Sequence, residues 1–440
     1  MIALLPSGMR GSRRRLGLGL SLLLALAGGG FGIHAVIHAV RAASHARAAE
    51  AYLEQSKHRQ WRVNLTLARE ELIHCRRISP NNAWFHFLAA RTARRLDDTE
   101  EAERLLHRAA QLGWVREAID LERALAQAQR GDLNPIEGVL ISFVVRDHPD
   151  KALILEALSR GYLASYRLHR ALACLDSWLD FQPDNTQALL WRGQTRLLLD
   201  RRDDALADYR RVLEADAEDE ESCRKLAELL LSSHRADQAL PYFLRWQQLR
   251  PNDPEALLGL AQCQAEMGQT DEAIALLDRL LSAEPRHAAA LALRGKLALD
   301  AGRIIEAESW LRKSLDLAPR ERAAVYSLYR CLQAQDRQAE ARQCLATLED
   351  IDADLARLDH LKNALQKAPQ DASLRCEMGQ ILLRNHQERE ALRWLASALK
   401  EDPHHAAARA ALADYYRQTT DRLPTNTAAQ RRNQAVPDGR

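Results

Sequence analysis

The sequence predicts an all-α solenoid of about ten helix-turn-helix repeats, preceded by an N-terminal membrane-anchor helix. Two columns of residues that recur every 34 positions support the solenoid, and an apolar N-terminal segment supports the anchor. The first column is alanine and consists of Ala171, Ala205, Ala239, Ala273, Ala307 and Ala341. The second column is mostly proline and consists of Pro149, Pro183, Ala217, Pro251, Pro285 and Pro319. Such a period is typical of stacked helix pairs, each of which contacts only its neighbours.

One period, residues 254–285, illustrates the expected unit. Leu257 and Leu260 have the spacing of a buried helix face. Gly268 stands where the first helix must end, as expected of a glycine in the left-handed conformation. Asp271 is the expected N-cap of the second helix. Each unit is therefore predicted to contain helix A, a short turn, helix B and a second turn.

The period has two irregularities. Upstream, Ala68 and Ala102 are again 34 residues apart, but Glu137 and Gly138 replace the alanine of the following unit. Downstream, the next alanine after Ala341 is delayed to Ala391, which adds 16 residues to one repeat. The inserted segment has a heptad-like seam of Leu345, Leu348, Ile351, Leu355, Leu358, Leu361 and Leu365. The seam fits a long helix B packed on its own array, and it also fits a short coiled coil that forms a homodimer through residues 345–365.

These observations divide the chain into seven segments. They are a basic N-terminal tail (1–15), a signal-anchor or transmembrane helix (16–40), divergent repeats (49–151), regular repeats (152–345), an extended helix insertion (346–368), a C-terminal repeat with a capping helix (372–419) and a disordered tail (421–440).

The N-terminal segment predicts a single membrane crossing. Residues 16–40 contain no Asp, Glu, Lys or Arg, and a crossing needs about 20 apolar residues. Arg10 and the run of arginines at 13–15 precede this segment, which favours a cytoplasmic N-terminus with the array outside the cytoplasm. The alternative is a signal peptide cleaved after Ala27, because the residues before Gly28 resemble an A-x-A site; the protein would then be secreted or periplasmic.

The composition excludes several classes of function. The 62 basic and 60 acidic residues leave a net charge of +2, without the basic stripe of a nucleic-acid-binding surface. The seven cysteines include no CxxC pair and are expected to be core residues, with Cys331 and Cys344 as the one pair whose bonding stays open. No GxxxxGK[ST], HExxH or GxSxG motif is present. We therefore expect no enzymatic activity, no cofactor and no metal.

Histidines in the N-terminal region leave one different interpretation. His34, His38 and His45 share one face of the expected helix. This stripe fits a polar surface where a helix meets lipid headgroups, and it also fits a haem or metal site if further ligands were supplied.

The repeat pattern resembles the tetratricopeptide repeat (TPR) family. A small residue stands at position 8 of successive units, as Ser159, Gly193, Ala227, Ala261 and Gly295. A large apolar residue stands at position 24, as Leu175, Tyr209, Phe243, Leu277 and Leu311. The resemblance implies that helix A lines a concave groove and that ligands are contacted from positions 2, 5, 6, 9, 12 and 13.

Transferred to this chain, the groove positions name candidate partner-binding residues. They are Arg160, Trp191, Gln194, Arg224, Glu228, Gln262, Lys296, Tyr326 and Arg330. None of the position-9 residues is the asparagine of the family's carboxylate clamp, so that use is not expected. The resemblance implies a scaffold for protein or peptide partners, and the N-terminal segment predicts that it is tethered to the membrane. The alternatives are a secreted or periplasmic assembly chaperone or carrier, and a haem- or metal-handling protein that uses the histidine stripe.

Overall fold

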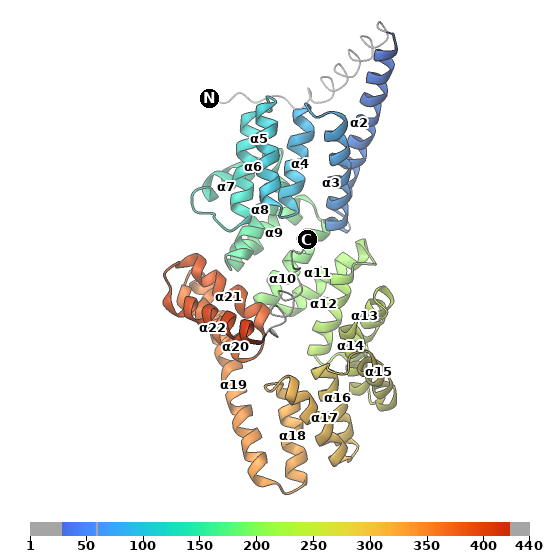
Figure 1. The fold of residues 1–440 in the computed structure, drawn as a ribbon, viewed down its shortest axis with the longest axis vertical. Helices are drawn as coiled ribbons and strands as arrows, with labels where there is room; N and C mark the ends of the chain where they lie inside the picture. Colours follow the sequence, from blue (N-terminus) through green and yellow to red (C-terminus); the bar gives the residue numbers. More distant parts are fainter. Residues whose placement is uncertain (1–28, 59, 423–440) are drawn as a thin grey trace, which may run out of the picture. The chain divides into compact units, whose positions relative to one another are not determined.

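The computed structural model describes residues 29–58 and 60–422, which form α-helices joined by short turns (Figure 1). The chain divides into two compact units: unit 1 ends at Leu226, and unit 2 begins at Ala227 and also takes in residues 165–167. The helices of unit 1 are α2 (Gly29–Gln55), α3 (Trp61–Ile78), α4 (Ala83–Arg95), α5 (Thr99–Gln111), α6 (Arg116–Gln129), α7 (Glu137–Val145), α8 (Lys151–Ala164), α9 (Leu168–Phe181), α10 (Thr186–Leu198) and α11 (Arg202–Ala215). The boundary falls within α12 (Glu220–Ser232).

Unit 2 continues with helix pairs and ends with a single helix. Its helices are α13 (Ala236–Leu249), α14 (Pro254–Glu266), α15 (Thr270–Ala283), α16 (Ala288–Asp300), α17 (Ile304–Leu317), α18 (Arg322–Ala334), α19 (Gln338–Lys367), α20 (Ala372–Arg384), α21 (Glu388–Glu401) and α22 (Ala406–Arg422). Helices α14 and α15, α16 and α17, and α20 and α21 pack as pairs, and α22 packs against α20 and α21. The all-helical solenoid expected from the 34-residue period is confirmed.

The recurring spacing of alanine and of the position-8 residue is explained by packing between helix A and helix B. Every residue of the alanine column between Ala171 and Ala341 is buried. At position 8, a Cβ atom added to Gly193 would lie 2.9 Å from the ring of Tyr209, which occupies position 24. A Cβ added to Gly295 would likewise lie 2.6 Å from Leu311. Small residues on helix A therefore admit the large side chain of helix B, and the two helices pack closely.

The turn between helix A and helix B repeats one backbone conformation. Its left-handed residue recurs every 34 positions, as Asp200, His234, Gly268, Gly302 and Asp336. The expected role of Gly268 is confirmed, with φ of 79°. The expected N-cap at Asp271 is wrong: α15 already begins at Thr270, after Gln269. Because the turn is so short, Asp271 falls in the first turn of the helix, where its charge still favours the helix dipole.

The unit that lacks the alanine is also irregular in three dimensions. Its second helix, α7, has only 9 residues, from Glu137 to Val145. Its first helix, α6, packs against α8 of the next unit. The contact is close, because a Cβ added to Gly161 of α8 would lie 2.1 Å from the carbonyl oxygen of Ala128 in α6.

The 16-residue insertion lengthens α19 to 30 residues. Most of its seam is buried in its own chain, namely Leu348, Ile351, Leu358, Leu361 and Leu365. Asp354 lies among these residues and accepts hydrogen bonds from Arg320, at 3.0 Å, and from Arg384, at 2.6 Å. The structure therefore shows the long helix packed on its own array. Only Leu345 and Leu355 of the seam remain exposed, and the homodimer through residues 345–365 stays a prediction.

At both ends of the described chain, the helices have different bounds from those expected. Helix α2 runs without interruption to Gln55, beyond the expected end of the anchor at residue 40. Residues 16–28 of the anchor lie outside the described residues. Within the described part of the chain, no helix is apolar over the length that a membrane crossing requires. Helix α22 extends to Arg422, and the rest of the expected disordered tail, 423–440, also lies outside the described residues.

Candidate functional site

The helices A of unit 1 are joined by buried ion pairs. Glu122 of α6 is 1% exposed and accepts a hydrogen bond from Arg94 at 2.8 Å and another from Arg91 at 2.5 Å, both in α4. Although burial alone would raise it, the charges of Arg94 and Arg91 lower the pKa of Glu122 below its usual value. Glu156 of α8 pairs in the same way with the buried Arg95, at 2.9 Å. The groove-facing side of these helices is therefore occupied by the chain's own charges.

Two candidate binding residues belong to this internal structure. Arg160 forms an ion pair with Asp97 and lies over the ring of Trp191, 6.0 Å from its centroid. Trp191 also makes edge contacts with Trp61 and Trp178, each at 6.1 Å between ring centroids. Arg160 and Trp191 thus stabilise unit 1, and we do not include them in the candidate site.

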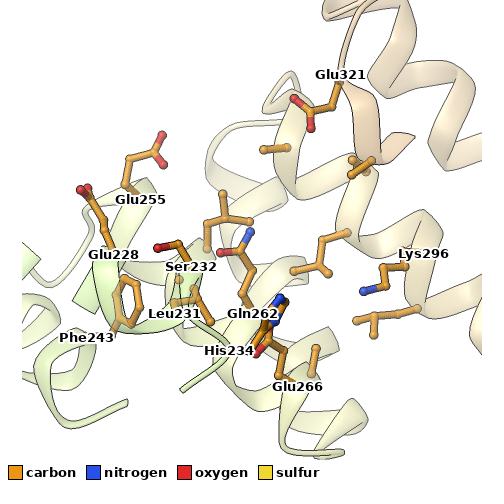
Figure 2. A pocket seen from close by; sticks show the side chains of 18 of the residues that line it. Glu228, Leu231, Ser232, His234, Phe243, Glu255, Gln262, Glu266, Lys296 and Glu321 are labelled. Carbon is orange, nitrogen blue, oxygen red and sulfur yellow. The ribbon is translucent and has the colours of Figure 1, made fainter. Parts of the chain in front are cut away.

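Unit 2 has an open cleft at the equivalent repeat positions. The cleft has a volume of about 520 Å³, and α12, α14 and α16 contribute consecutive groove positions to it. All six groove positions of α14 line the cleft, as Glu255, Leu258, Gly259, Gln262, Ala265 and Glu266. Three residues of the position-9 row, Glu228, Gln262 and Lys296, meet here. Figure 2 shows Gln262 between Glu228 and Glu255 on one side and Lys296 on the other.

Small side chains account for the hollow. Its lining includes Ser232, Gly259, Ala265, Ala289, Ala292 and Ala323. Gly259 stands at the repeat position that Trp191 occupies in unit 1, two residues before the position-8 residue. A Cβ at Gly259 would lie 2.0 Å from the ring of Phe243, so this position must remain glycine for Phe243 to form part of the wall. Phe243 stacks on Trp246, at 6.0 Å between ring centroids, and both rings contribute to the apolar lining.

The charged groups of the cleft are predominantly acidic. Its carboxylates are those of Glu228, Glu255, Glu266, Asp300 and Glu321, and Lys296 is the only lysine or arginine of the lining. Asp300 lies 3.4 Å from Arg330, Glu266 lies 3.7 Å from the imidazole of His234, and Glu255 lies 3.6 Å from that of His287.

His287 interacts with Glu255 and also caps a helix that lines the cleft. Its Nδ1 atom accepts a hydrogen bond from the backbone N–H of Ala290 and so caps α16. Interaction with Glu255 raises the pKa of His287, and His287 lowers the pKa of Glu255 in return. Glu255 is therefore held as a carboxylate beside the cleft.

The remaining candidate residues lie outside the cleft lining. Gln194 is exposed on α10, and Arg224 is half-buried on α12. Tyr326 is 50% exposed, with its ring 6.4 Å from that of Tyr329. Arg330 reaches the cleft only through its ion pair with Asp300.

The histidine stripe has a structural role in the part that is described. His45 makes a 2.6 Å hydrogen bond to Glu71 and stacks on His74, with ring centroids 5.0 Å apart, so it holds α2 against α3. The side chain of His34 lies outside the description. No group of His, Cys, Asp or Glu side chains in the described residues could hold a metal ion. All seven cysteines, Cys331 and Cys344 included, are free thiols.

Comparison with known proteins identifies the repeat. The family model described as tetratricopeptide repeat matches residues 230–297, which include most of the cleft. The chain therefore contains tetratricopeptide repeats. The model described as anaphase-promoting complex, cyclosome, subunit 3 matches residues 266–348. No curated protein matches the chain.

Several solved structures are similar to parts of this chain. YrrB, described as a TPR protein with an unusual peptide-binding site, is 23% identical over 42% of this chain and 96% of its own, with a TM-score of 0.38. PilW, described as a widely conserved type IV pilus biogenesis factor, is 22% identical over 45% of this chain and 92% of its own, with a TM-score of 0.39. A tetratricopeptide repeat protein from Parabacteroides merdae is 19% identical over 65% of this chain and 99% of its own, with a TM-score of 0.33.

The sequence contained a signal for the buried network that its interpretation did not use. Arg91 precedes Ala102 by 11 residues, as Arg160 precedes Ala171, so Arg91 is the position-9 residue of a divergent TPR unit. Glu122 and Glu156 are 34 residues apart and both stand at position 5. Extending groove positions 5 and 9 into the divergent repeats predicts that Arg91, Glu122 and Glu156 lie on the inner side of unit 1.

Proposed function

We propose that this TPR protein is a non-enzymatic scaffold that holds a segment of a partner protein in the cleft of unit 2. The observation that carries the proposal is the convergence of groove positions from three successive helices A on one cleft of about 520 Å³. This volume is within the range of about 300–1,000 Å³ that is usual for ligand sites. Apolar walls beside a central amide, that of Gln262, suit an extended peptide, whose backbone needs hydrogen bonds and whose side chains need apolar contact.

Replacing Gln262 with tryptophan tests this proposal, because the larger ring would fill the cleft without removing a core residue. We expect at least about a tenfold loss of partner capture, which corresponds to about 1.4 kcal/mol. The measurement is chemical crosslinking of the full-length protein in its native cells, followed by mass spectrometry of the crosslinked partners.

Ala275→Trp is the matched control for this experiment. Ala275 is exposed on α15 and does not line the cleft, so the same ring is added elsewhere on unit 2. If Gln262→Trp and Ala275→Trp retain the same partners at the same yield, the cleft is not the binding site.

We further propose that residues 16–40 anchor the array to a membrane, with the repeats outside the cytoplasm. The support for this is the apolar segment and the arginines that precede it. The mass of the mature N-terminus, measured on protein extracted from membranes, should include residues 16–40. A mature chain that begins at Gly28 and is recovered without detergent would instead identify a secreted or periplasmic carrier.

A further inference from the structure

The cleft of unit 2 combines an apolar floor with an excess of carboxylates. Leu258, Leu293 and Leu297 supply apolar surface between the charged residues. Glu321 is the residue that precedes α18, and its side chain makes no capping hydrogen bond to that helix. Its carboxylate lines the cleft together with that of Glu255, from the N-terminal end of α14. Figure 2 shows the Glu321 carboxylate on one border of the cleft and those of Glu228 and Glu255 on another.

Positively charged side chains are scarce in the lining of the cleft. Lys296 is the only lysine or arginine that lines it. Arg330 neutralises Asp300 from outside, and His234 and His287 face Glu266 and Glu255. Among the residues that line the cleft, five carry carboxylates, whereas Lys296 is the single lysine. A concave surface lined by charges of one sign concentrates ligands of the opposite sign and rejects those of the same sign.

We infer that the partner segment is cationic, with lysine or arginine residues spaced by apolar ones, and this inference rests on the function proposed above. The apolar side chains contact the leucine floor and the wall formed by Phe243 and Trp246. The cationic side chains reach Glu255 and Glu321 at the border. The amide of Gln262 is placed between them for the backbone of the segment. An acidic segment meets like charges on most sides and is excluded.

Three fluorescent peptides test this inference on the full-length protein. They share the same leucines and differ only at the positions between them, which carry lysine, glutamine or glutamate. We expect the lysine peptide to bind at least about tenfold more tightly than the glutamate peptide in about 50 mM salt. The difference should shrink in about 500 mM salt, because exposed charges are then screened. Fluorescence anisotropy measures all three affinities.

Two double variants separate the cleft from the general charge of the protein. Glu255→Gln with Glu321→Gln should weaken the lysine peptide by about threefold or more and leave the glutamine peptide unchanged. Asp271→Asn with Glu272→Gln removes the same charge from exposed positions of α15 and should change neither affinity. Circular dichroism melting of each variant verifies that it is folded.

The other outcomes identify which statement is wrong. If the glutamine or glutamate peptide binds as tightly as the lysine peptide, and Gln262→Trp abolishes that binding, the function stands and the cationic preference is wrong. If no peptide binds although Gln262→Trp loses native partners, the same conclusion holds. A tenfold gain in lysine-peptide affinity on removal of residues 423–440, which include Arg431 and Arg432, would assign the cleft to the chain's own tail.

Discussion

Replacing Glu122 with glutamine should lower the free energy of unfolding by about 3–5 kcal/mol, since the change leaves buried guanidinium groups without a counter-charge. Arg94 is 1% exposed, and its ion-pair partner is Glu122. Arg91 would keep only its longer contact with Asp150, at 3.2 Å. The expected effect is large because the pair is buried. Removing one partner of a buried ion pair destabilises the fold by more than the intact pair stabilises it.

Urea denaturation followed by tryptophan fluorescence measures this prediction, because unit 1 contains Trp84, Trp114 and Trp178. The matched control is Glu103→Gln, which breaks an ion pair of similar length, 2.6 Å to Arg123. Both of those side chains are more than 40% exposed, so its loss should cost less than about 1 kcal/mol. Equal effects of the two substitutions would show that the network of Glu122 is not desolvated.

Replacing Gly161 with alanine should destabilise unit 1 by at least about 2 kcal/mol, although alanine is the better helix former by about 1 kcal/mol. The new Cβ would lie 2.1 Å from the carbonyl oxygen of Ala128, and a backbone atom cannot rotate away as a side chain can. Helices α6 and α8 would have to separate, and the buried side chains between them would lose contact.

Gly138→Ala is the matched control for this second prediction. Gly138 lies in α7, and a Cβ added there meets no atom within 4 Å. Alanine should therefore stabilise the protein by about 0.5–1 kcal/mol, through helix propensity and lower entropy of the unfolded chain. Thermal melts of both variants decide the matter: a stabilising Gly161→Ala would contradict the close approach of α6 and α8.

Residues that act within one repeat could be predicted from the sequence. The pairing of Gly193 with Tyr209 and of Gly295 with Leu311 follows from two columns of a single period, because helix A and helix B of one unit are joined by a short turn. Between successive repeats, the position-9 row predicts only that Gln262 and Lys296 share a surface, and both line the cleft.

Contacts between repeats were less accessible to that reasoning. Arg94 and Glu122 belong to different repeats, and their hydrogen bond depends on the rotation between successive repeats. It also depends on the burial of both side chains, which the sequence pattern of the divergent repeats does not predict. The same applies to the contrast between the filled inner side of unit 1 and the open cleft of unit 2. That contrast depends on which side chains are large, as at Trp191, and which are absent, as at Gly259.

Because the A–B turn has the same backbone conformation in successive repeats, one 34-residue period could be deleted or duplicated at this turn. Gly268 and Gly302 have φ angles of 79° and 75°, and the residues that follow them, Gln269 and Arg303, have nearly the same backbone angles. Joining Gly268 directly to Arg303 would therefore reproduce an existing turn and remove one period, residues 269–302. The shortened chain would retain helix stacking but lose α15 and α16, and with α16 six residues of the cleft lining, Lys296 among them. Duplication or loss of one such period would thus change the binding surface while every remaining turn and helix pair kept its present conformation.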